Sequence, residues 1–574
     1  MTDELRETKD ESIVKKQVSR REFLKYAGLA GGVIAVGGGL GGLIAACGGT
    51  TTTTTAGVTT TMGGATTTMG ATTTSMAQGT TTTAAMAPVA GGIMHHITTA
   101  GPQDVGFWPK MGPTDEGPIF PSVERICEYT ADRKLVPFLA KTFVEDPKAL
   151  TMACELNPGI MFHDGTELTA DIAKWNYQVG IDGKKLQYAD VITSIEVTGK
   201  YTYVIHLTRW DNQLVNSLGW VPMFSQDAFM KSGADEKARE AWALDHCVGT
   251  GPFVMKEFVR DQSITWVKNA SYWQKGLPYL DGIDYKIIPD ATTAGQLMQS
   301  GQGDIFQNAD AKSQDDLKKK GFTDQSAWAG FIYHLMPNTM DPASPLNKQG
   351  VREAVEYAIN KEELIKALGF GIDVPVYAVE PPGEWGGDTI SVKRTYDPAK
   401  AKQLLTDAGY PNGCPVDILA IAQSGGGNAY AEGIKGYLDA AGFQTNLDIA
   451  DPGRFYGSMF GTGWKDLGLM FSGMDPNALI SCNRWWSPTP MTNLTSFKRP
   501  PEFTKLFADA NAGSDEASQI AGTEAIVKLM NEQALMIPLY LEPAGLLIAK
   551  YVHTDYPAEG FIRWMWGTTW MDKH

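Results

Sequence analysis

Two short motifs in the chain contain residue types that can do chemistry. His163-Asp164-Gly165 offers an imidazole and a carboxylate for metal binding or acid–base work, and Gly249-Thr250-Gly251-Pro252 could cradle a phosphate. The Asp-Gly pair lies between strand-like runs and is typical of a turn, where glycine supplies a positive φ. The second segment lacks the lysine and the spacing of a P-loop. We therefore expect both motifs to be turns, the second at a tight bend where the chain passes between lobes.

Signatures of the common enzyme classes are missing from the sequence. It contains no Gly-x-Ser-x-Gly elbow, no zinc-ligand spacing and no dinucleotide fingerprint, and its eight histidines are scattered apart from His95-His96. Two carboxylates for glycoside hydrolysis need only spatial proximity and could be hidden among the 65 acidic residues. We expect no enzyme activity, no cofactor and no metal, with glycoside hydrolysis as the competing hypothesis.

The N-terminal residues are typical of an export signal. Arg20-Arg21 lies in the segment Ser19 to Lys25, directly before an apolar stretch that runs from Tyr26 to Ala46. This order predicts export by the twin-arginine route. A transmembrane helix is the alternative, but eight glycines between Gly28 and Gly42 make the stretch a poor helix former.

A cysteine follows directly after this stretch. Ile44-Ala45-Ala46-Cys47 resembles the lipobox of bacterial lipoproteins, in which small residues precede a cysteine that receives a diacylglyceryl group. Two or more acyl chains anchor a protein stably, which one chain does not. We therefore expect residues 1–46 to be a signal peptide and Cys47 to attach the mature protein to the extracytoplasmic face of the cell membrane.

The net charge and the cysteine content limit which partners and which cysteine chemistry the protein can have. The chain has 65 acidic and 49 basic residues and a formal net charge of −16, which argues against nucleic acid as a partner. The five cysteines after Cys47 show no CxxC spacing, so no zinc or redox motif is predicted and at least one thiol must stay free. Export permits a disulfide. The spacing does not define a pairing among Cys127, Cys154, Cys247, Cys414 and Cys482.

The organisation of the chain changes at residue 92. Residues 48–92 consist almost entirely of Thr, Ala, Gly and Met, which predicts a flexible tether over 47–92. Beyond it, β-rich runs alternate with helical segments, and this pattern predicts an α/β body in several lobes. The clearest of these elements are Tyr203–Leu207, Ile264–Val267, Ile283–Ile288, Val351–Leu368 and Pro398–Ala408.

Seven segments of the body occur in a fixed order. They are Phe162–Gly165 with Leu168–Ile172, Val248–Phe253, Asn269 with Tyr272-Trp273, Pro289-Asp290, Gly301–Asp304, Val351–Lys361 and Tyr396–Leu405. Together they resemble solute-binding protein family 5, the extracellular proteins that include the oligopeptide- and dipeptide-binding proteins. Within the sixth segment, Arg352 lies on a helix rich in apolar positions and is expected to cap or pair rather than to bind a solute.

The resemblance implies a fold and a role. The fold would be α/β, a three-lobed type II periplasmic-binding-protein fold with a hinge between lobes. Closure of the lobes around a ligand would be the signal to the permease subunits and ATPase of an ABC importer. We expect a monomer that captures a peptide or a similar small solute. Lobe I would combine residues 93–125, 240–338 and 536–574, lobe II would span 126–239, and lobe III would span 339–535.

One element differs from the peptide-binding members of this family. Those proteins carry Asp-x-x-Asp-Pro after a Trp, and the first Asp pairs with the α-ammonium group of the peptide. The matching stretch here is Phe471–Pro476, with Ser472 in place of the first Asp and Asp475 as the second. A neutral hydroxyl cannot supply the charge-assisted bond that a buried ammonium needs. Either Asp466, just after Trp464, replaces this carboxylate, or the ligand is uncharged and of the oligosaccharide type.

Aromatic residues supply the remaining candidates for the ligand site. Their flat faces suit sugar rings and other ring-bearing ligands, although most tryptophans are expected in the core. The predicted ligand-binding residues are Trp464, Phe471, Ser472, Asp475 and Asp466, with Trp220 and Trp328 as further candidates.

Overall fold

The computed structural model describes residues 87–130, 134–422, 428–490, 492–555 and 566–572. For Pro113, Thr114, Ala327, Trp328 and Ala329 it describes the backbone only. The predicted signal peptide, Cys47 and all but the last residues of the predicted tether lie outside the described residues.

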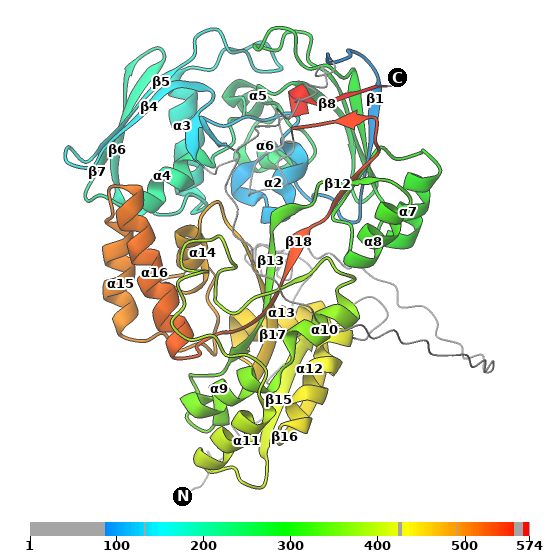
Figure 1. Cartoon of the computed structure of the whole chain (residues 1–574). Coiled ribbons are helices and arrows are strands. Elements are labelled where there is room, and N and C mark those ends of the chain that lie inside the picture. Colours follow the sequence, from blue (N-terminus) through cyan, green and yellow to red (C-terminus); the bar gives the residue numbers. More distant parts are fainter. Residues whose placement is uncertain (1–86, 131–133, 423–427, 491, 556–565, 573–574) are drawn as a thin grey trace, which may run out of the picture. The chain divides into compact units, whose positions relative to one another are not determined.

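A mixed seven-stranded sheet contains the first strand of the body (Figure 1). β1 pairs in parallel with β10 and β11, and the remaining neighbours are antiparallel. In sheet order the strands are β12 (Thr323–Asp324), β19 (Leu546–Ile548), β11 (Ile305–Gln307), β1 (Ile93–Thr98), β10 (Gly282–Ile287), β9 (Ser263–Lys268) and β8 (Phe253–Val259). The helices that accompany this sheet are α7 (Ala291–Gln299) and α8 (Ala311–Lys319).

A four-stranded antiparallel sheet forms a second unit of secondary structure. Its central strands alternate buried and partly exposed residues, the period that a half-buried strand requires. The sheet order is β4 (Ala140–Asp146), β5 (Thr151–Leu156), β7 (Thr202–Leu207) and β6 (Ile192–Gly199). Nearby elements are η1 (Trp108–Lys110), α2 (Pro113–Ile119), β2 (Cys127–Tyr129), β3 (Leu135–Pro137), α3 (Ala170–Asp182), η2 (Ala189–Val191), α4 (Asn212–Gly219), α5 (Gln226–Lys231) and α6 (Glu236–Ala243).

A six-stranded mixed sheet lies between two apolar clusters of buried side chains. Its order is β14 (Val374–Pro375), β18 (Ile537–Ala544), β13 (Ala327–Pro337), β17 (Leu467–Gly473), β15 (Cys414–Ile421) and β16 (Phe443–Ala450). The associated helices are η3 (Pro345–Asn347), α9 (Gln349–Ala358), α10 (Lys361–Leu368), α11 (Pro398–Asp407), α12 (Ala429–Ala440), α13 (Pro452–Gly457), the π-helical turn η4 (Ser458–Thr462), α14 (Ala478–Trp485), α15 (Glu502–Asn511) and α16 (Glu516–Glu532). Close to the C-terminus lie β20 (Val552–His553), η5 (Trp566–Thr568) and β21 (Trp570–Met571).

Two neighbouring strands connect the seven-stranded and six-stranded sheets. The chain leaves the first sheet at Ser326, whose hydroxyl accepts from the backbone N–H of Leu546 at 3.0 Å, and enters β13 directly. It returns along β18, which pairs with β13 and precedes β19 (Figure 1). At this return Gly545 approaches the segment between β11 and α8 so closely that a Cβ would lie 2.2 Å from the carbonyl oxygen of Ala309. The sequence had grouped both strands with lobe I, whereas their pairing belongs to the six-stranded sheet.

Local sequence accounts for most helix starts. The Pro289-Asp290 motif ends in the N-cap of α7, where the Asp290 carboxylate accepts from Thr293 N–H at 2.7 Å, and Asp397 caps α11 in the same way. α11 therefore begins at the predicted residue. The predicted helix Val351–Leu368 is wrong in its length, because it is two helices, α9 and α10, separated at Ile359-Asn360. The Asn360 side chain accepts from Glu363 N–H at 3.1 Å and so starts a new helix.

The four-stranded and six-stranded units also contact each other directly. Asn212, at the start of α4, donates to the carbonyl oxygens of Ala510 at 2.8 Å and Gly513 at 2.9 Å. Ala510 lies in the last turn of α15 and Gly513 just after it, and α4 is seen beside this helix in Figure 1. All five described cysteines are buried and free, so no disulfide joins any of these units within the described residues.

Candidate functional site

The His163-Asp164-Gly165 motif forms a turn, as predicted. Gly165 has a φ of +84°, and its N–H donates to Phe162 at 2.9 Å. The His163 ring bonds the carbonyl oxygen of Gly251 at 2.9 Å, and burial lowers its pKa. The Asp164 carboxylate accepts from Ser225 at 2.6 Å. Both side chains are therefore used in holding the turn against its neighbours.

The Gly249–Pro252 segment packs tightly against the chain at residues 121–123. A Cβ on Gly249 would lie 2.1 Å from the carbonyl oxygen of Ser122, so only glycine fits there. The Thr250 hydroxyl donates to Glu124 at 2.7 Å. Tyr272 and Trp273 of another motif donate to the same carboxylate at 2.6 and 2.9 Å. The two motifs are therefore joined through the Glu124 carboxylate. The Gly249–Pro252 segment packs against the chain and does not form a phosphate-binding loop.

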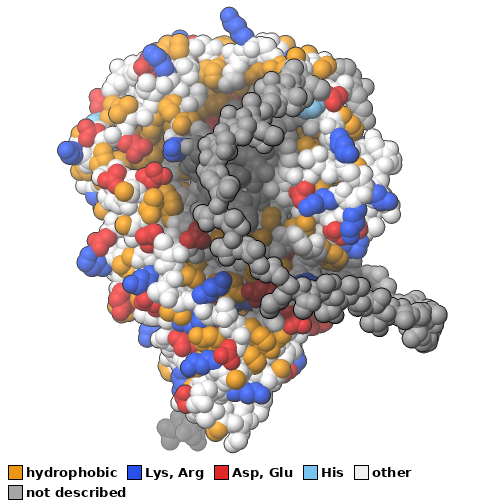
Figure 2. Space-filling model, viewed as in Figure 1, with side chains coloured by type: hydrophobic (Ala, Val, Ile, Leu, Met, Phe, Trp, Pro, Cys, Tyr) orange, Lys and Arg blue, Asp and Glu red, His pale blue; other side chains and the backbone are white. Residues whose placement is uncertain are grey.

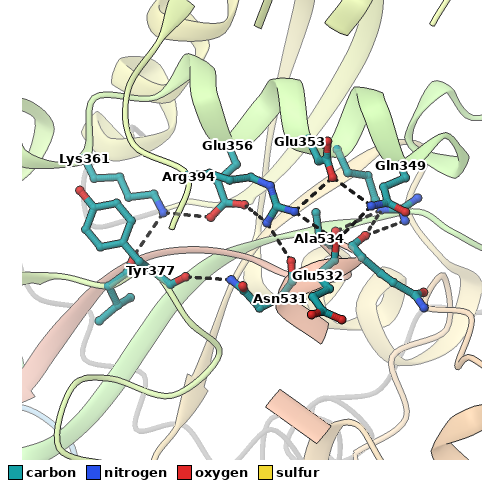
Figure 3. Close-up of polar contacts among 12 residues, drawn as sticks. Gln349, Glu353, Glu356, Lys361, Tyr377, Arg394, Asn531, Glu532 and Ala534 are labelled. Carbon is teal, nitrogen blue, oxygen red and sulfur yellow. Dashed lines mark hydrogen bonds and ion pairs between the residues drawn. The ribbon is translucent and has the colours of Figure 1, made fainter. Parts of the chain in front are cut away.

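Arg352 has a structural role, as its helix predicted. Its guanidinium donates to backbone carbonyls on two sides, at Leu346 and at Gln533. A second buried network lies beside it (Figure 3): Arg394 is 3.1 Å from Glu353 and 3.2 Å from Glu356, and donates to the carbonyl of Asn531 at 2.8 Å. Lys361 lies 3.6 Å from the other oxygen of Glu356. These contacts join α9 and α10 to the end of α16, and all the charges involved have partners.

Trp464 and Asp466 lie in the interior of the six-stranded unit. Trp464 is 5% exposed, and its indole N–H donates to the carbonyl oxygen of Met336 at 2.9 Å. Asp466 is 3% exposed and accepts from the Ser344 hydroxyl at 2.7 Å and from Asp417 N–H at 3.0 Å. Both side chains have complete sets of protein partners. The geometry gives them a role in folding and does not support Asp466 as a replacement ammonium ligand.

Ser472 and Phe471 point to opposite faces of the sheet because they are consecutive in β17. Ser472 is paired with Ile332, which belongs to the buried apolar cluster on its side of the sheet. Phe471 faces the other side, where its ring centroid lies 5.4 Å from that of Phe331 and 5.5 Å from that of Tyr333. The structure therefore separates two residues that the sequence had grouped.

Asp475 pairs with a cation of its own chain. Its carboxylate accepts from the guanidinium of Arg484, and its backbone N–H donates to Ser481 at 3.0 Å. Burial raises the pKa of Asp475, and the nearby arginine opposes this rise. The pKa of the Tyr129 hydroxyl, which belongs to the four-stranded unit, is raised first by burial and then by the Asp475 carboxylate. Asp475 thus lies where these two units meet.

The two remaining tryptophans lie elsewhere. The Trp220 indole N–H donates to Glu116 at 2.7 Å, and the Arg125 guanidinium lies 3.8 Å from its ring centroid. Trp328 is in β13, and its side chain lies outside what the structure describes. The six predicted ligand residues whose side chains the structure describes therefore do not converge on one surface.

A different group of residues does converge, on the face of the six-stranded sheet that carries Phe471. Tyr333 and Tyr540 stack with centroids 4.7 Å apart, and Tyr430 of α12 stacks on Tyr540 at 4.3 Å. Each end of this three-tyrosine column meets a carboxyl group. Tyr430 donates to Asp373, and the Tyr333 hydroxyl bonds Glu542. We call this set, with Phe331 and Phe471, the aromatic–acid cluster.

The pKa values of both carboxyl groups in the aromatic–acid cluster are raised. Burial, and then the neighbouring Glu542, raise the pKa of Asp373 to about 8. Burial also raises the pKa of Glu542, as does Asp310 at the N-cap of α8. Asp310 comes from the seven-stranded unit, so the cluster lies where the two sheets meet at the β13 and β18 crossings.

Other cavities lie away from this cluster. An open hollow of about 510 Å³ is lined by residues that include Lys402, Tyr410 and Gln444. A cavity beside Phe107, Trp175 and Phe229 has a volume of about 20 Å³, room for about one water molecule. Among the described residues no group of three His, Cys, Asp or Glu side chains is placed to hold a metal ion. Acidic and basic side chains are intermixed over the coloured part of the face in Figure 2. No described helix has the length and apolar character that crossing a bilayer requires.

Comparison with known proteins identifies the family. A model of the bacterial extracellular solute-binding proteins, family 5 (middle region), matches residues 134–493, which is more than half of the chain. The chain belongs to family 5 of the bacterial extracellular solute-binding proteins. It is a substrate-binding component of an ABC importer and has an extracytoplasmic location.

Two relatives illustrate the range of the family. Heme-binding protein A of Haemophilus influenzae is 30% identical over 331 residues, which span 51% of this chain and 57% of that protein. The glutathione-binding protein GsiB of Escherichia coli is 25% identical over 425 residues, covering 72% of this chain and 81% of that protein. The match to heme-binding protein A thus spans little more than half of that relative's length.

Solved structures establish the fold of this family 5 protein. The periplasmic binding protein DppA of Helicobacter pylori, in complex with the peptide STSA, has a TM-score of 0.72 at 20% identity and covers 84% of this chain and 99% of that chain. The oligopeptide-binding protein AppA of Bacillus subtilis, in complex with a nonapeptide, has a TM-score of 0.71 at 21% identity, with coverage of 85% and 100%. The predicted α/β, type II periplasmic-binding-protein fold is confirmed.

Proposed function

We propose that this protein captures a short peptide or a similar small solute, at a site that includes the aromatic–acid cluster, and delivers it to the permease of its ABC importer. The observation that carries this proposal is the placement of the cluster. It lies on the six-stranded sheet directly at the two strand crossings to the seven-stranded sheet, where it also faces Asp310. Bending at these crossings would open and close the site.

The side chains at the cluster suit a solute with both apolar and polar parts. Phe331, Tyr333, Tyr430 and Glu542 are each partly exposed, so part of each residue is in contact with solvent. Aromatic rings provide apolar contact area, and phenols and carboxyls add directional hydrogen bonds. Relatives and structural neighbours that bind glutathione and peptides support the peptide class. An uncharged oligosaccharide is not favoured, because it would leave the carboxyl groups without a cationic partner.

The remaining features of the role follow from the sequence. We propose that the protein leaves the cytoplasm by the twin-arginine route, is anchored through acylated Cys47, and acts as a monomer whose lobes close on the ligand. We also propose that it releases its ligand unchanged. The relatives are solute-binding proteins, which supports a role without catalysis.

Native mass spectrometry of the full-length protein tests the proposed function. The protein should be purified from its own host under mild conditions and transferred intact to the gas phase. A bound peptide or peptide-like compound that denaturation releases is the expected result. A mixture of random tetrapeptides should raise the melting temperature of ligand-free protein. Release of only sugars, together with no shift by any peptide mixture, would show that the peptide class is wrong.

A further inference from the structure

The carboxyl groups of Asp373 and Glu542 lie close together at the strand crossings, and neither has an ion-pair partner among the described residues; that of Asp310 lies near Glu542. Asp373 precedes β14, Glu542 lies in β18, and Asp310 caps α8 from the other sheet. The charge that acts on Asp373 comes from Glu542, and the charge that acts on Glu542 comes from Asp310. None of the three forms an ion pair with Lys, Arg or His within the residues that the structure describes.

Other buried acids of this chain are treated differently. Glu356 is flanked by Lys361 and Arg394, and Asp475 has Arg484. Burial of a charge is costly unless it is paired. Within the described part of the chain, the fold thus supplies a cation to the carboxylates of Glu356 and Asp475 and supplies none to those of Asp373 and Glu542.

The Asp373 side chain also has an unused hydrogen-bonding atom. The residue is 8% exposed, and its Oδ2 accepts from the Tyr430 hydroxyl. Its Oδ1 is buried and has no hydrogen-bond partner among the described residues. A buried polar atom without a partner destabilises the protein, and an incoming donor would remove this cost.

The surrounding aromatic rings suit a positive charge. Tyr333, Tyr540 and Tyr430 form the stacked column between the two carboxyl groups, and the faces of phenol rings attract cations. Phe331 adds a partly exposed ring at the same end of β13. Carboxyl groups beside aromatic faces make a site that discriminates an organic cation from a neutral isostere.

We propose that Asp373, Glu542 and Asp310, with Tyr333 and Tyr430, form a subsite for a primary ammonium group of the captured solute. The ammonium can come from the N-terminus of a peptide or from a lysine side chain, since both present the same three donors. This subsite would take over the role that Ser472 cannot fill. The inference rests on the proposed capture of a peptide-like solute at this cluster, and its test separates the two.

The first measurement uses a pair of small probes on the full-length protein. Tyramine carries a phenol and an ammonium group, whereas 4-ethylphenol has nearly the same shape without the charge. Binding of each is followed by the shift in melting temperature and by titration calorimetry. Tyramine should bind at least tenfold more tightly than 4-ethylphenol. Glu542→Gln and Asp373→Asn should each weaken tyramine binding by about tenfold to a hundredfold, since a hydrogen bond to a charged group is lost.

Control variants show whether the effect belongs to these residues. Glu432→Gln neutralises an exposed acid on α12, two residues from Tyr430, and should leave tyramine binding unchanged. Asp310→Asn is not a control but tests the third carboxyl group of the subsite: it retains an N-cap side chain, so helix α8 should stay folded while tyramine binding weakens. If Asp373→Asn does not fold, Glu542→Gln and Tyr430→Phe carry the test.

Three tetrapeptide pools then identify the source of the ammonium group. One has free N-termini and no lysine, one is N-acetylated and contains one lysine per peptide, and one is N-acetylated without lysine. If the first or second pool binds more tightly than the third, and Glu542→Gln abolishes this difference, the subsite is supported. The tighter pool then shows whether the ammonium group comes from the N-terminus or from lysine. Equal binding of all pools, with no tyramine preference, overturns the subsite but leaves peptide capture intact. No binding of any pool, with a retained tyramine preference, refutes peptide capture but supports the ammonium subsite.

Discussion

Asp475 and Arg484 form a buried ion pair across the turn that joins β17 to α14, where a ligand carboxylate had been predicted. The side chain of Asp475 is 2% exposed and that of Arg484 is 19% exposed. Removal of one partner from a buried pair leaves an uncompensated charge. This pair therefore holds the loop after β17 in place, next to the four-stranded unit.

Arg484→Met should destabilise the protein by roughly 3 kcal/mol or more, because it strands a buried carboxylate. Asp475→Asn should cost less, since the charge that it leaves without a partner is that of Arg484, which is 19% exposed and is partly solvated. Urea denaturation of both variants measures the difference. The matched control is Lys505→Met, which breaks an exposed pair with Asp509 and should cost less than about 1 kcal/mol. Equal losses for the buried and exposed pairs would contradict this role.

Asp466 should affect stability and leave ligand affinity unchanged. Asp466→Ala removes the acceptor for the Ser344 hydroxyl and for Asp417 N–H, at a cost of roughly 3 kcal/mol from two hydrogen bonds to a charged group. Ser344→Ala removes only one of these bonds and should cost about half as much. The measurement is unfolding in urea alongside calorimetry with a bound peptide. A large loss of affinity in a folded Asp466→Ala protein would instead restore Asp466 to the ligand site.

Local sequence rules predicted much of the fold. The strands that begin at Thr202, Ser263 and Gly282 were found within a residue of their predicted starts, because apolar alternation is a property of the strand itself. The start of α11 at Pro398 follows from the cap at Asp397. The break between α9 and α10 was missed, because the apolar period continues across Asn360 while its side chain starts a new helix.

The ligand site was harder to predict from sequence. Trp464 was predicted to bind the ligand because it is an aromatic residue near an acid, but its indole N–H donates to the carbonyl oxygen of Met336 in the core. Asp373 and Glu542 lie far apart in the chain, and the pairing of Val374 with Leu541 brings them together. Their only sequence signal is an acid next to a short apolar run in a strand, a pattern too common to single them out.

Export and anchoring can be tested through the predicted signal. Replacement of both Arg20 and Arg21 by Lys keeps the charge but removes the twin-arginine pair, so full-length precursor should accumulate in the cytoplasm. Lys15→Arg with Lys16→Arg changes the same region without touching the pair and should be exported normally. Immunoblots of cytoplasmic and envelope fractions measure both. Normal export of the Arg20/Arg21 variant would refute the twin-arginine route.

Cys47→Ala should separate export from anchoring. The protein should still leave the cytoplasm, but it should shift from the detergent phase to the aqueous phase in detergent partitioning, because its acyl chains are absent. If the Cys47→Ala protein stays in the detergent phase, another segment of the chain must attach it to the membrane.

The ligand-free protein should become less stable as the pH rises from about 4 to about 8. The pKa of Asp373 is raised from 3.8 to about 8, first by burial and then by Glu542, so the folded chain keeps a proton that the unfolded chain has lost. Since the folded state binds more protons over this range, its free energy of unfolding falls with increasing pH, by on the order of a few kcal/mol. Asp373→Asn should flatten this slope, whereas Glu432→Gln should not. The groups that face Asp373 are Tyr430 on α12, Glu542 and Tyr540 on β18, Tyr333 on β13 and, beyond Glu542, Asp310 on α8.

The same proton gives a signature of ligand binding. An ammonium group favours the ionised carboxylate, so tyramine binding at pH 7 should release a proton from the Asp373–Glu542 pair. Calorimetric titrations in phosphate and in Tris, whose ionisation enthalpies differ, should give different apparent enthalpies for the wild-type protein. Asp373→Asn should remove most of this difference. Identical enthalpies in both buffers would mean that Asp373 is already ionised in the empty site, and that its burial is compensated by a contact other than the one from Tyr430.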